Sequence, residues 1–185
     1  GQIGGMDNNI LQSIARDSDG NIVGTGYFFA SCDVDPGAPQ LIYASSGEAD
    51  IFINKITEQG DLIWSKHIGG SLMDGGLLIA TDILNNIYVS GQFEGTVDFN
   101  PGSSVSNLTG SANGDRFILK LNSSGNFLWA KKIGSNAFEY FSFIDVNTYG
   151  EIYLGGGFEG TLDVDPGAAE VNLVSAGTYD MFVLK

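Results

Sequence analysis

Hydrophobic residues occur along this chain in short runs that are separated by turn-forming residues. Between residues 71 and 135, the pair Asn85-Asn86 and the triplet Ser124-Gly125-Asn126 mark tight turns between such runs. The runs of this part cover residues 77–80, 87–93, 105–109, 117–121 and 127–133. No window shows a sustained helical period with capping residues, so the pattern predicts an all-β protein.

The same pattern returns every 65 residues without an insertion or a deletion. The positions that keep this spacing are Gly26, Gly91 and Gly156; Pro36, Pro101 and Pro166; Asp50, Asp115 and Asp180; Phe52, Phe117 and Phe182; Lys55, Lys120 and Lys185; and Trp64 and Trp129. The period divides the single repeat region 1–185 into units of approximately 6–70, 71–135 and 136–185. Residues 1–5 match the tail of an outer strand, and the third unit is expected to lack its outer strand.

Each unit is expected to form a four-stranded antiparallel sheet with two apolar faces. One such sheet cannot bury both faces alone, and neighbouring units on either side would cover them. Repeated β-units of this kind are typical of the blades of a β-propeller, whereas the coils of a β-solenoid are usually much shorter. A closed ring usually needs four to eight blades, so three units predict a partial propeller or an arc of a larger ring. Repeated isoleucines such as Ile14 and Ile79, and the repeated phenylalanines, are expected in the core.

The second unit carries four motifs that point to a known repeat. They are Asn-Ile-Tyr-Val-Ser-Gly-Gln-Phe at 86–93, Gly-Thr-Val-Asp-Phe-Asn-Pro-Gly at 95–102, Asp-Arg-Phe-Ile-Leu-Lys-Leu at 115–121 and Gly-Asn-Phe-Leu-Trp-Ala-Lys at 125–131. This pattern resembles the bacterial SBBP-type repeat of seven-bladed β-propellers over nearly the whole chain. The first unit departs from it at 29–32, where Phe-Ala-Ser-Cys stands in place of Glu-Gly-Thr-Val.

The resemblance implies a secreted or surface-exposed bacterial protein, commonly large and built of several domains. In Bacteroidota, such repeats commonly accompany sorting domains. The resemblance does not imply one particular activity.

Composition and charge narrow the classes of partner. Hydrophobic residues make up 43% of the chain and charged residues 16%, which is typical of a globular protein. The formal net charge of −14 argues against binding to nucleic acid and to anionic lipid, because both need clustered lysines and arginines. No apolar run reaches 18 residues, so the sequence predicts no insertion into a membrane.

The motif Asp-Val-Asp-Pro-Gly at 33–37 recurs as Asp-Phe-Asn-Pro-Gly at 98–102 and again at 163–167. Its acidic and amide side chains would lie on one face of an extended chain, where their oxygens could bind Ca²⁺. The candidate ligands are Asp33, Asp35, Asp98, Asn100, Asp163 and Asp165. The alternative is a β-turn, in which proline fixes φ, glycine permits a positive φ and aspartate caps the backbone. The sequence leaves both explanations open, and Ca²⁺ is the one cofactor it suggests.

Single-copy residues carry little recognisable chemistry. Cys32 aligns with Val97 and Leu162, so we expect a buried thiol. The one histidine, His67, aligns with Lys132 and Gln2 and is expected to point outward. Without a second histidine or a nucleophile motif, the sequence argues against a zinc site and a catalytic dyad.

Function is therefore sought where the units differ. The segment Phe138-Glu139-Tyr140 carries two aromatic residues without counterparts in the other units, and it is the candidate binding loop for a protein or a glycan. We expect a non-enzymatic scaffold of adhesion type, secreted or on the cell surface, with further blades of the parent chain or a second copy as additional partners. A purely structural role in a surface appendage is the first alternative. A hydrolase-type channel site built on Glu139 and Asp145 is the second.

Overall fold

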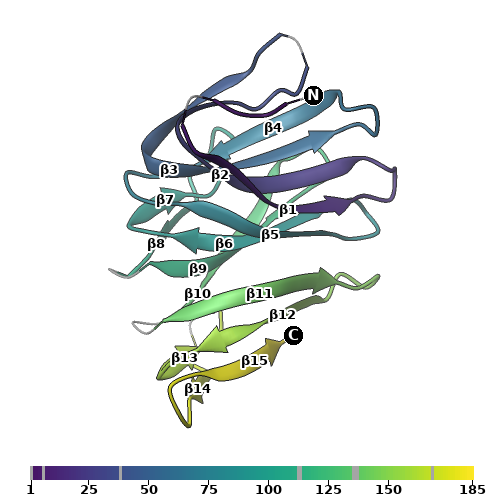
Figure 1. The fold of residues 1–185 in the computed structure, drawn as a ribbon. Coiled ribbons are helices and arrows are strands. Elements are labelled where there is room, and N and C mark those ends of the chain that lie inside the picture. The colour runs from purple at the N-terminus through teal and green to yellow at the C-terminus, as the bar shows by residue number, and fades with distance from the viewer. Residues whose placement is uncertain (1, 6, 38, 112–113, 135–137, 168) are drawn as a thin grey trace.

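The computed structural model describes residues 2–5, 7–37, 39–111, 114–134, 138–167 and 169–185. All regular elements in these residues are β-strands. They form three sheets of three or four strands, stacked from top to bottom in Figure 1, and two short two-stranded hairpins. The predicted all-β class is confirmed. The described residues contain no helix that could cross a membrane.

Each sheet is a small antiparallel meander, which we call a blade. Blade 1 contains β1 (Asn9–Arg16), β2 (Ile22–Asp33), β3 (Ile42–Ile56) and β4 (Leu62–Ile68). Blade 2 contains β5 (Gly75–Thr81), β6 (Ile87–Phe93), β9 (Asp115–Leu121) and β10 (Phe127–Ile133). Blade 3 contains β11 (Glu139–Val146), β12 (Ile152–Phe158) and β15 (Asp180–Leu184). The first strands β1, β5 and β11 contact one another in this order, as expected for the inner strands of a propeller.

The segment between the second and third main strands differs among the blades. In blades 2 and 3 it forms separate short hairpins, β7 (Thr96–Asp98) with β8 (Asn107–Thr109) and β13 (Thr161–Asp163) with β14 (Asn172–Val174). Gly95 and Gly160 start these hairpins with φ values of 66° and 60°. In blade 1 this position is Ala30, which keeps a positive φ of 50°, and β2 and β3 continue through a bulge. The divergence at 29–32 therefore turns a separate hairpin into an extension of the sheet.

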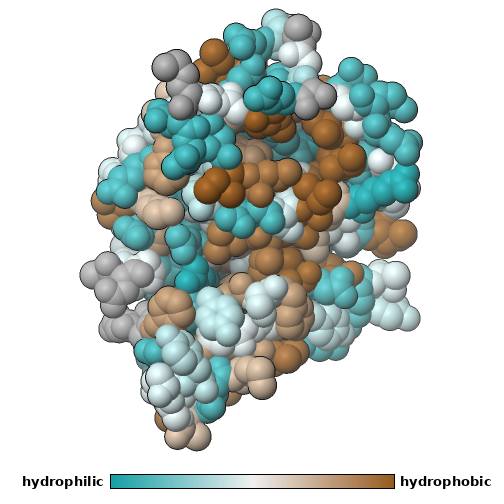
Figure 2. Space-filling model, in the orientation of Figure 1, coloured by the Kyte–Doolittle hydropathy of each residue, from teal (hydrophilic) through white to brown (hydrophobic). Residues whose placement is uncertain are grey.

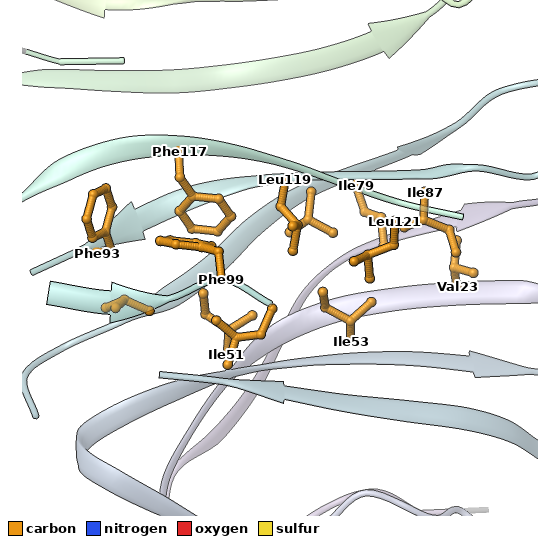
Figure 3. Packing of buried hydrophobic residues seen from close by; sticks show 13 residues of the cluster. Val23, Ile51, Ile53, Ile79, Ile87, Phe93, Phe99, Phe117, Leu119 and Leu121 are labelled. Atoms are coloured by element: carbon orange, nitrogen blue, oxygen red, sulfur yellow. The ribbon is translucent and has the colours of Figure 1, made fainter. Parts of the chain in front are cut away.

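The main core lies between blades 1 and 2. Figure 3 shows Ile51 and Ile53 of β3 facing Phe117 and Leu119 of β9, with Phe99 between them. All five side chains are fully buried. A second cluster joins blades 2 and 3 in the same way and contains Ile118, Ile133, Phe141, Leu154, Phe158, Leu162 and Phe182. Blade 2 therefore buries both of its faces, as the repeat pattern predicts for a unit with neighbours on both sides.

Polar contacts fix the blades relative to one another. The amide and hydroxyl of Ser18 donate to Asn85 Oδ1 over 2.8 and 2.7 Å. The indole of Trp64 donates to the carbonyl of Ser123 over 3.2 Å, and Thr81 donates to the carbonyl of Arg16 over 3.0 Å. These bonds join hairpins and strands of blades 1 and 2, so the stacking of the two sheets is specific as well as hydrophobic.

The repeated glycines Gly26, Gly91 and Gly156 have one structural cause. Each lies on the second strand of its blade, opposite a β-bulge in the first strand. A Cβ atom at these positions would come within 1.8–1.9 Å of a carbonyl oxygen of the first strand. Only glycine leaves room for this close approach.

Two expectations about single residues are wrong, and a third is confirmed. Ile14 is 62% exposed, although its counterpart Ile79 is 6% exposed, because no sheet in the described residues covers that face of blade 1. His67 does not point outward: its Nε2 lies 2.5 Å from Asp50 Oδ2, and its ring stacks on Tyr43. Cys32 is fully buried, and this burial, aided by the charge of Asp33, raises the pKa of its thiol to about 11.

Candidate functional site

The repeated Asp-x-Asp/Asn-Pro-Gly loops are built as turns. In blade 2, Asp98 Oδ1 accepts hydrogen bonds from the amides of Asn100 and Ser106 over 3.0 and 2.8 Å. The next side chain, Asn100, accepts from the amide of Gly102 over 2.9 Å. The same bonds recur on Asp33 and Asp35 in blade 1 and on Asp163 and Asp165 in blade 3. The aspartate therefore caps the backbone in all three units, as the turn explanation predicts. The positive φ that it also expected is absent at Gly37, Gly102 and Gly167.

These turns close each blade by placing one apolar side chain against its phenylalanines. In blade 2 this side chain is Phe99, whose ring centre lies 5.2 Å from that of Phe93 and 4.7 Å from that of Phe117. Val34 and Val164 occupy the same position in the other blades. In the described part of the chain, no group of three or more His, Cys, Asp or Glu side chains could hold a metal ion. Binding of Ca²⁺ by the loops stays a prediction.

Because Asp98 accepts hydrogen bonds from two backbone amides, its substitution tests both the turn and the binding of Ca²⁺ by the loop. We expect Asp98→Asn to retain the stability of the wild type, since an amide oxygen can still accept both bonds. Asp98→Ala should lose about 1–2 kcal/mol of unfolding free energy. Urea denaturation with and without millimolar Ca²⁺ measures both effects. A Ca²⁺-dependent gain in stability that Asp98→Asn removes would show that the loop is a metal site instead.

A surface cluster of aromatic side chains, which we call the aromatic patch, lies at one end of blade 3. It consists of Phe138, Tyr140 and Tyr179, which are 53%, 43% and 53% exposed. The ring centre of Phe138 lies 6.3 Å from that of Tyr140 and 6.1 Å from that of Tyr179. The structure thus joins two residues of the predicted binding loop to a third that is about 40 residues away in the sequence.

Glycines of β12 support the patch on the free face of blade 3, by which we mean the face turned away from blade 2. A Cβ atom at Gly157 would lie 2.8 Å from the ring of Tyr140, so this ring rests directly on the strand. Gly155 accommodates Phe143 in the same way, and Phe143 is 42% exposed. Large rings over glycines cover strand backbone that would otherwise be bare. Tyr140 is therefore held on the sheet, while Phe138 and Tyr179 lie directly before β11 and β15.

Glu139, the third residue of the predicted loop, lies inside the molecule. Its side chain is 3% exposed and approaches Asp115 and Gly134 at the junction with blade 2. The guanidinium of Arg116 donates to the backbone carbonyl of Glu139, with its Nε 2.8 Å away. Glu139 thus belongs to the contact between blades, and only its two aromatic neighbours reach the surface.

The two acids considered for a channel site do not converge. Glu139 pairs with Phe158, whereas Asp145 pairs with Tyr153, which lies five residues earlier on β12. Because successive residues of a strand point to opposite faces, Phe158 and Tyr153 lie on different faces of the sheet, and so do their partners. The carboxyl groups of Glu139 and Asp145 therefore do not form an acid pair.

Both ends of the blade stack expose positions that are buried inside it. Ile53 and Ile118 are 0% and 5% exposed at the two inner junctions, but their counterpart Val183 on the free face of blade 3 is 72% exposed. Met181 next to it is 90% exposed. At the other end, Leu11 and Ile14 leave the outer face of blade 1 apolar. Figure 2 shows hydrophobic residues running over the side of the molecule on which β1, β5 and β11 lie.

Asp74, a buried acid at the junction between blades 1 and 2, has a raised pKa. Asp74 is fully buried and accepts the amides of Gly70 and Glu94 over 2.7 and 3.2 Å. Burial, with the negative charges of Asp50 and Glu94 adding to it, raises the pKa of Asp74 to about 6, although the two hydrogen bonds oppose the shift. The folded chain therefore takes up a proton at this junction in mildly acidic solution.

The shifted pKa of Asp74 predicts how stability depends on pH. Between pH 4 and 6 the folded state binds more protons than the unfolded state. Protonation of Asp74 therefore stabilises the fold fully below the unfolded pKa, and this stabilisation is lost as pH rises through 6. Asp74→Asn stays neutral at both pH values. We expect its free energy of unfolding, relative to that of the wild type, to be about 2–3 kcal/mol more favourable at pH 7.5 than at pH 4. Urea denaturation at both pH values checks this, and a pH-independent difference would refute it.

Tyr179 is the functional candidate that sequence reasoning missed. It aligns with Ala49 and Gly114. An aromatic residue at a position where the other units have small residues could have marked Tyr179 as a candidate. The alignment could not place it beside Phe138, because that contact depends on how the starts of β11 and β15 lie on either side of the end of β12.

Comparison with known proteins supports the propeller-type architecture. No family model matches the chain. Over an alignment of 117 positions, which covers 56% of the chain, the sequence is 31% identical to an uncharacterized WD repeat-containing protein of Acanthamoeba polyphaga mimivirus. The match spans 8% of that viral protein, so the chain corresponds to a small part of its relative. WD repeats form four-stranded propeller blades, in agreement with the antiparallel sheets found here. The chain is therefore a β-propeller-like repeat protein, while the SBBP-type family and a bacterial source stay predictions.

Proposed function

We propose that this chain is a non-enzymatic propeller-type scaffold that binds a protein partner through the aromatic patch of blade 3. The observation that carries the proposal is the exposure of three clustered rings, Phe138, Tyr140 and Tyr179, at positions that are not aromatic in blades 1 and 2. Exposed tyrosine and phenylalanine offer large contact area at small entropic cost, and aromatic residues are enriched in interfaces. The similarity to a WD repeat protein supports a scaffold of this kind.

We propose in addition that the scaffold acts in a secreted or cell-surface protein, in a role of adhesion type. The support is the resemblance of its motifs to SBBP-type repeats, together with a strongly acidic composition. A glycan is the second candidate ligand of the patch, because exposed rings can also stack on sugars.

We propose that further blades, from the parent chain or from a second copy, cover the apolar end faces. The support is the burial of Ile53 and Ile118 at the inner junctions, against the exposure of Val183. A blade on the free face of blade 3 would leave Glu159 partly accessible, since its counterparts Phe29 and Glu94 stay partly exposed beside the next blade. It would cover part of Tyr179, because the counterpart Ala49 is fully buried and bridges to the next blade at Met73. The binding partner and the covering blade therefore compete for this end of the patch.

A binding experiment with Phe138→Ala tests the proposal. The wild type, Phe138→Ala and a control, Leu128→Ala, are immobilised and compared in pull-downs and on a glycan array. Leu128 is a suitable control because it is 47% exposed on the outer strand of blade 2. We expect a protein to be retained by the wild type and the control but lost with Phe138→Ala. Glycan retention with the same dependence would favour the second candidate, and equal retention by all three proteins would exclude the patch.

A further inference from the structure

Two tyrosines elsewhere in the molecule show how this chain holds a lysine ammonium. Tyr88 donates its hydroxyl to Asp82 over 2.9 Å, and Lys120 Nζ lies 3.9 Å from Asp82 and 4.7 Å from the centre of the Tyr88 ring. The ammonium is thus attracted both by the carboxylate and by the face of the ring.

Blade 3 repeats this arrangement with a different acid. Tyr153 donates to Glu151 over 3.2 Å, and Lys185 Nζ lies 2.5 Å from Glu151 and 6.0 Å from the centre of the Tyr153 ring. In both blades, a lysine of the same sheet therefore lies near the carboxylate and near the ring of the tyrosine that is bonded to it.

The aromatic patch contains a third tyrosine–carboxylate pair. Glu159 lies beside the patch, since its amide donates to the carbonyl of Phe138 over 2.9 Å. Its carboxylate interacts with the hydroxyl of Tyr179, and this interaction raises the pKa of Tyr179. Among the residues that the structure describes, no lysine or arginine forms an ion pair with Glu159. Arg116, which reaches β11 from blade 2, is engaged with the carbonyl of Glu139 and with Gln92. The pair therefore has the acid and the ring but lacks the cation.

We propose that the aromatic patch, with Glu159, binds an arginine or lysine side chain of a protein partner. The carboxylate supplies charge, and the rings of Tyr179, Phe138 and Tyr140 supply cation-attracting faces and an apolar floor for the aliphatic stem. The net charge of −14 favours a partner that is basic over one that is acidic. This inference rests on the proposed function and adds the chemistry of the partner to it.

Arginine fits the site better than lysine. Its planar guanidinium can stack on one ring of the patch while its donors reach the Glu159 carboxylate, and it sheds water more easily than an ammonium. A basic segment in extended form, with apolar residues beside the arginine, would use both the charge and the exposed rings.

The test uses model peptides on the whole chain. The probe is an eight-residue peptide of alternating arginine and leucine, and its partner peptide carries glutamine in place of each arginine. Binding is measured by calorimetry and by backbone NMR shifts of the wild type, Glu159→Gln, Phe138→Ala and the control Asp61→Asn. The control removes the same charge from an exposed turn of blade 1.

We expect the arginine peptide to shift the signals of β11 and of the start of β15, and to bind about tenfold less tightly to Glu159→Gln. Asp61→Asn should bind as the wild type does, and the glutamine peptide should bind about tenfold less tightly. Equal binding of both peptides, with loss only in Phe138→Ala, would show that the patch does not recognise a cationic side chain. The proposal that the patch binds a protein would then still stand. No shift at the patch with either peptide would overturn the inference, and the pull-down with Phe138→Ala would then decide on the proposed function alone.

Discussion

Replacing Lys55 with methionine is expected to lower the free energy of unfolding by about 3–5 kcal/mol. Lys55 and Asp17 are each 5% exposed, and Lys55 Nζ lies 2.8 Å from Asp17 Oδ2. Burial opposes ionisation of Asp17, but hydrogen bonds from Lys55 and Asn21 outweigh it and hold the pKa of Asp17 below its usual value. Removing the lysine leaves a buried carboxylate without its cation, and it also removes a bond from Lys55 to the carbonyl of Ser123 in blade 2.

The repeat offers two matched controls for this substitution. Lys120 is 20% exposed in its side chain and lies 3.9 Å from Asp82, so Lys120→Met should cost about 1 kcal/mol. Lys185 is 58% exposed in its side chain, and Lys185→Met should leave the urea midpoint unchanged within error. Urea denaturation of the three variants should therefore show losses in the order of burial. Equal losses would mean that the repeated lysine acts through something other than the buried ion pair.

Gly91→Ala is expected to destabilise the chain by at least about 3 kcal/mol. The added Cβ atom would lie 1.9 Å from the carbonyl oxygen of Gly75 and 2.9 Å from the ring of Phe117. The carbonyl belongs to the backbone of β5 directly before its bulge, so the clash cannot be relieved by a change of rotamer. Loss of the bulge would also disturb the inner strand that contacts β1 and β11.

Gly177→Ala is the control for Gly91→Ala. A Cβ atom at Gly177 meets no other atom within 4 Å, and we expect its melting temperature to stay within about 2 °C of the wild type. Circular dichroism melts of both variants measure the difference. A Gly91→Ala protein as stable as the control would show that the repeated glycine is not required by the bulge.

Most of the fold could be predicted from the sequence, because the repeat tests every position three times. Turn residues such as Ser124-Gly125-Asn126 and runs such as 87–93 predict strands that the structure confirms. The divergent stretch 29–32 could not be resolved in the same way. Ala30 keeps the positive φ of Gly95 and Gly160, so the backbone conformation at this position is the same in all three blades. The difference lies in how 31–33 and 42–44 continue β2 and β3, which the repeat pattern does not show.

The candidate site was predicted only in part. Phe138 and Tyr140 stand out as unique aromatic residues, but the inward position of Glu139 follows from the register of β11 with β12. The position of His67 was misjudged because its counterparts are polar, whereas Asp50 and Tyr43 hold its half-buried ring. The exposure of Ile14 follows from its place at the end of the stack, and a repeat pattern does not reveal which units are terminal.

The most direct test of the central claim, that binding resides where the blades differ, is a photo-crosslinking scan of the full natural protein in its native cells. A photoreactive phenylalanine analogue is placed in turn at Tyr179, at the outer-strand position Leu128 and at Val105 beside a repeated turn. The latter two positions are 47% and 72% exposed. We predict a discrete protein adduct at 179 and none at 128 or 105. Adducts at 128 or 105 without one at 179 would contradict the account.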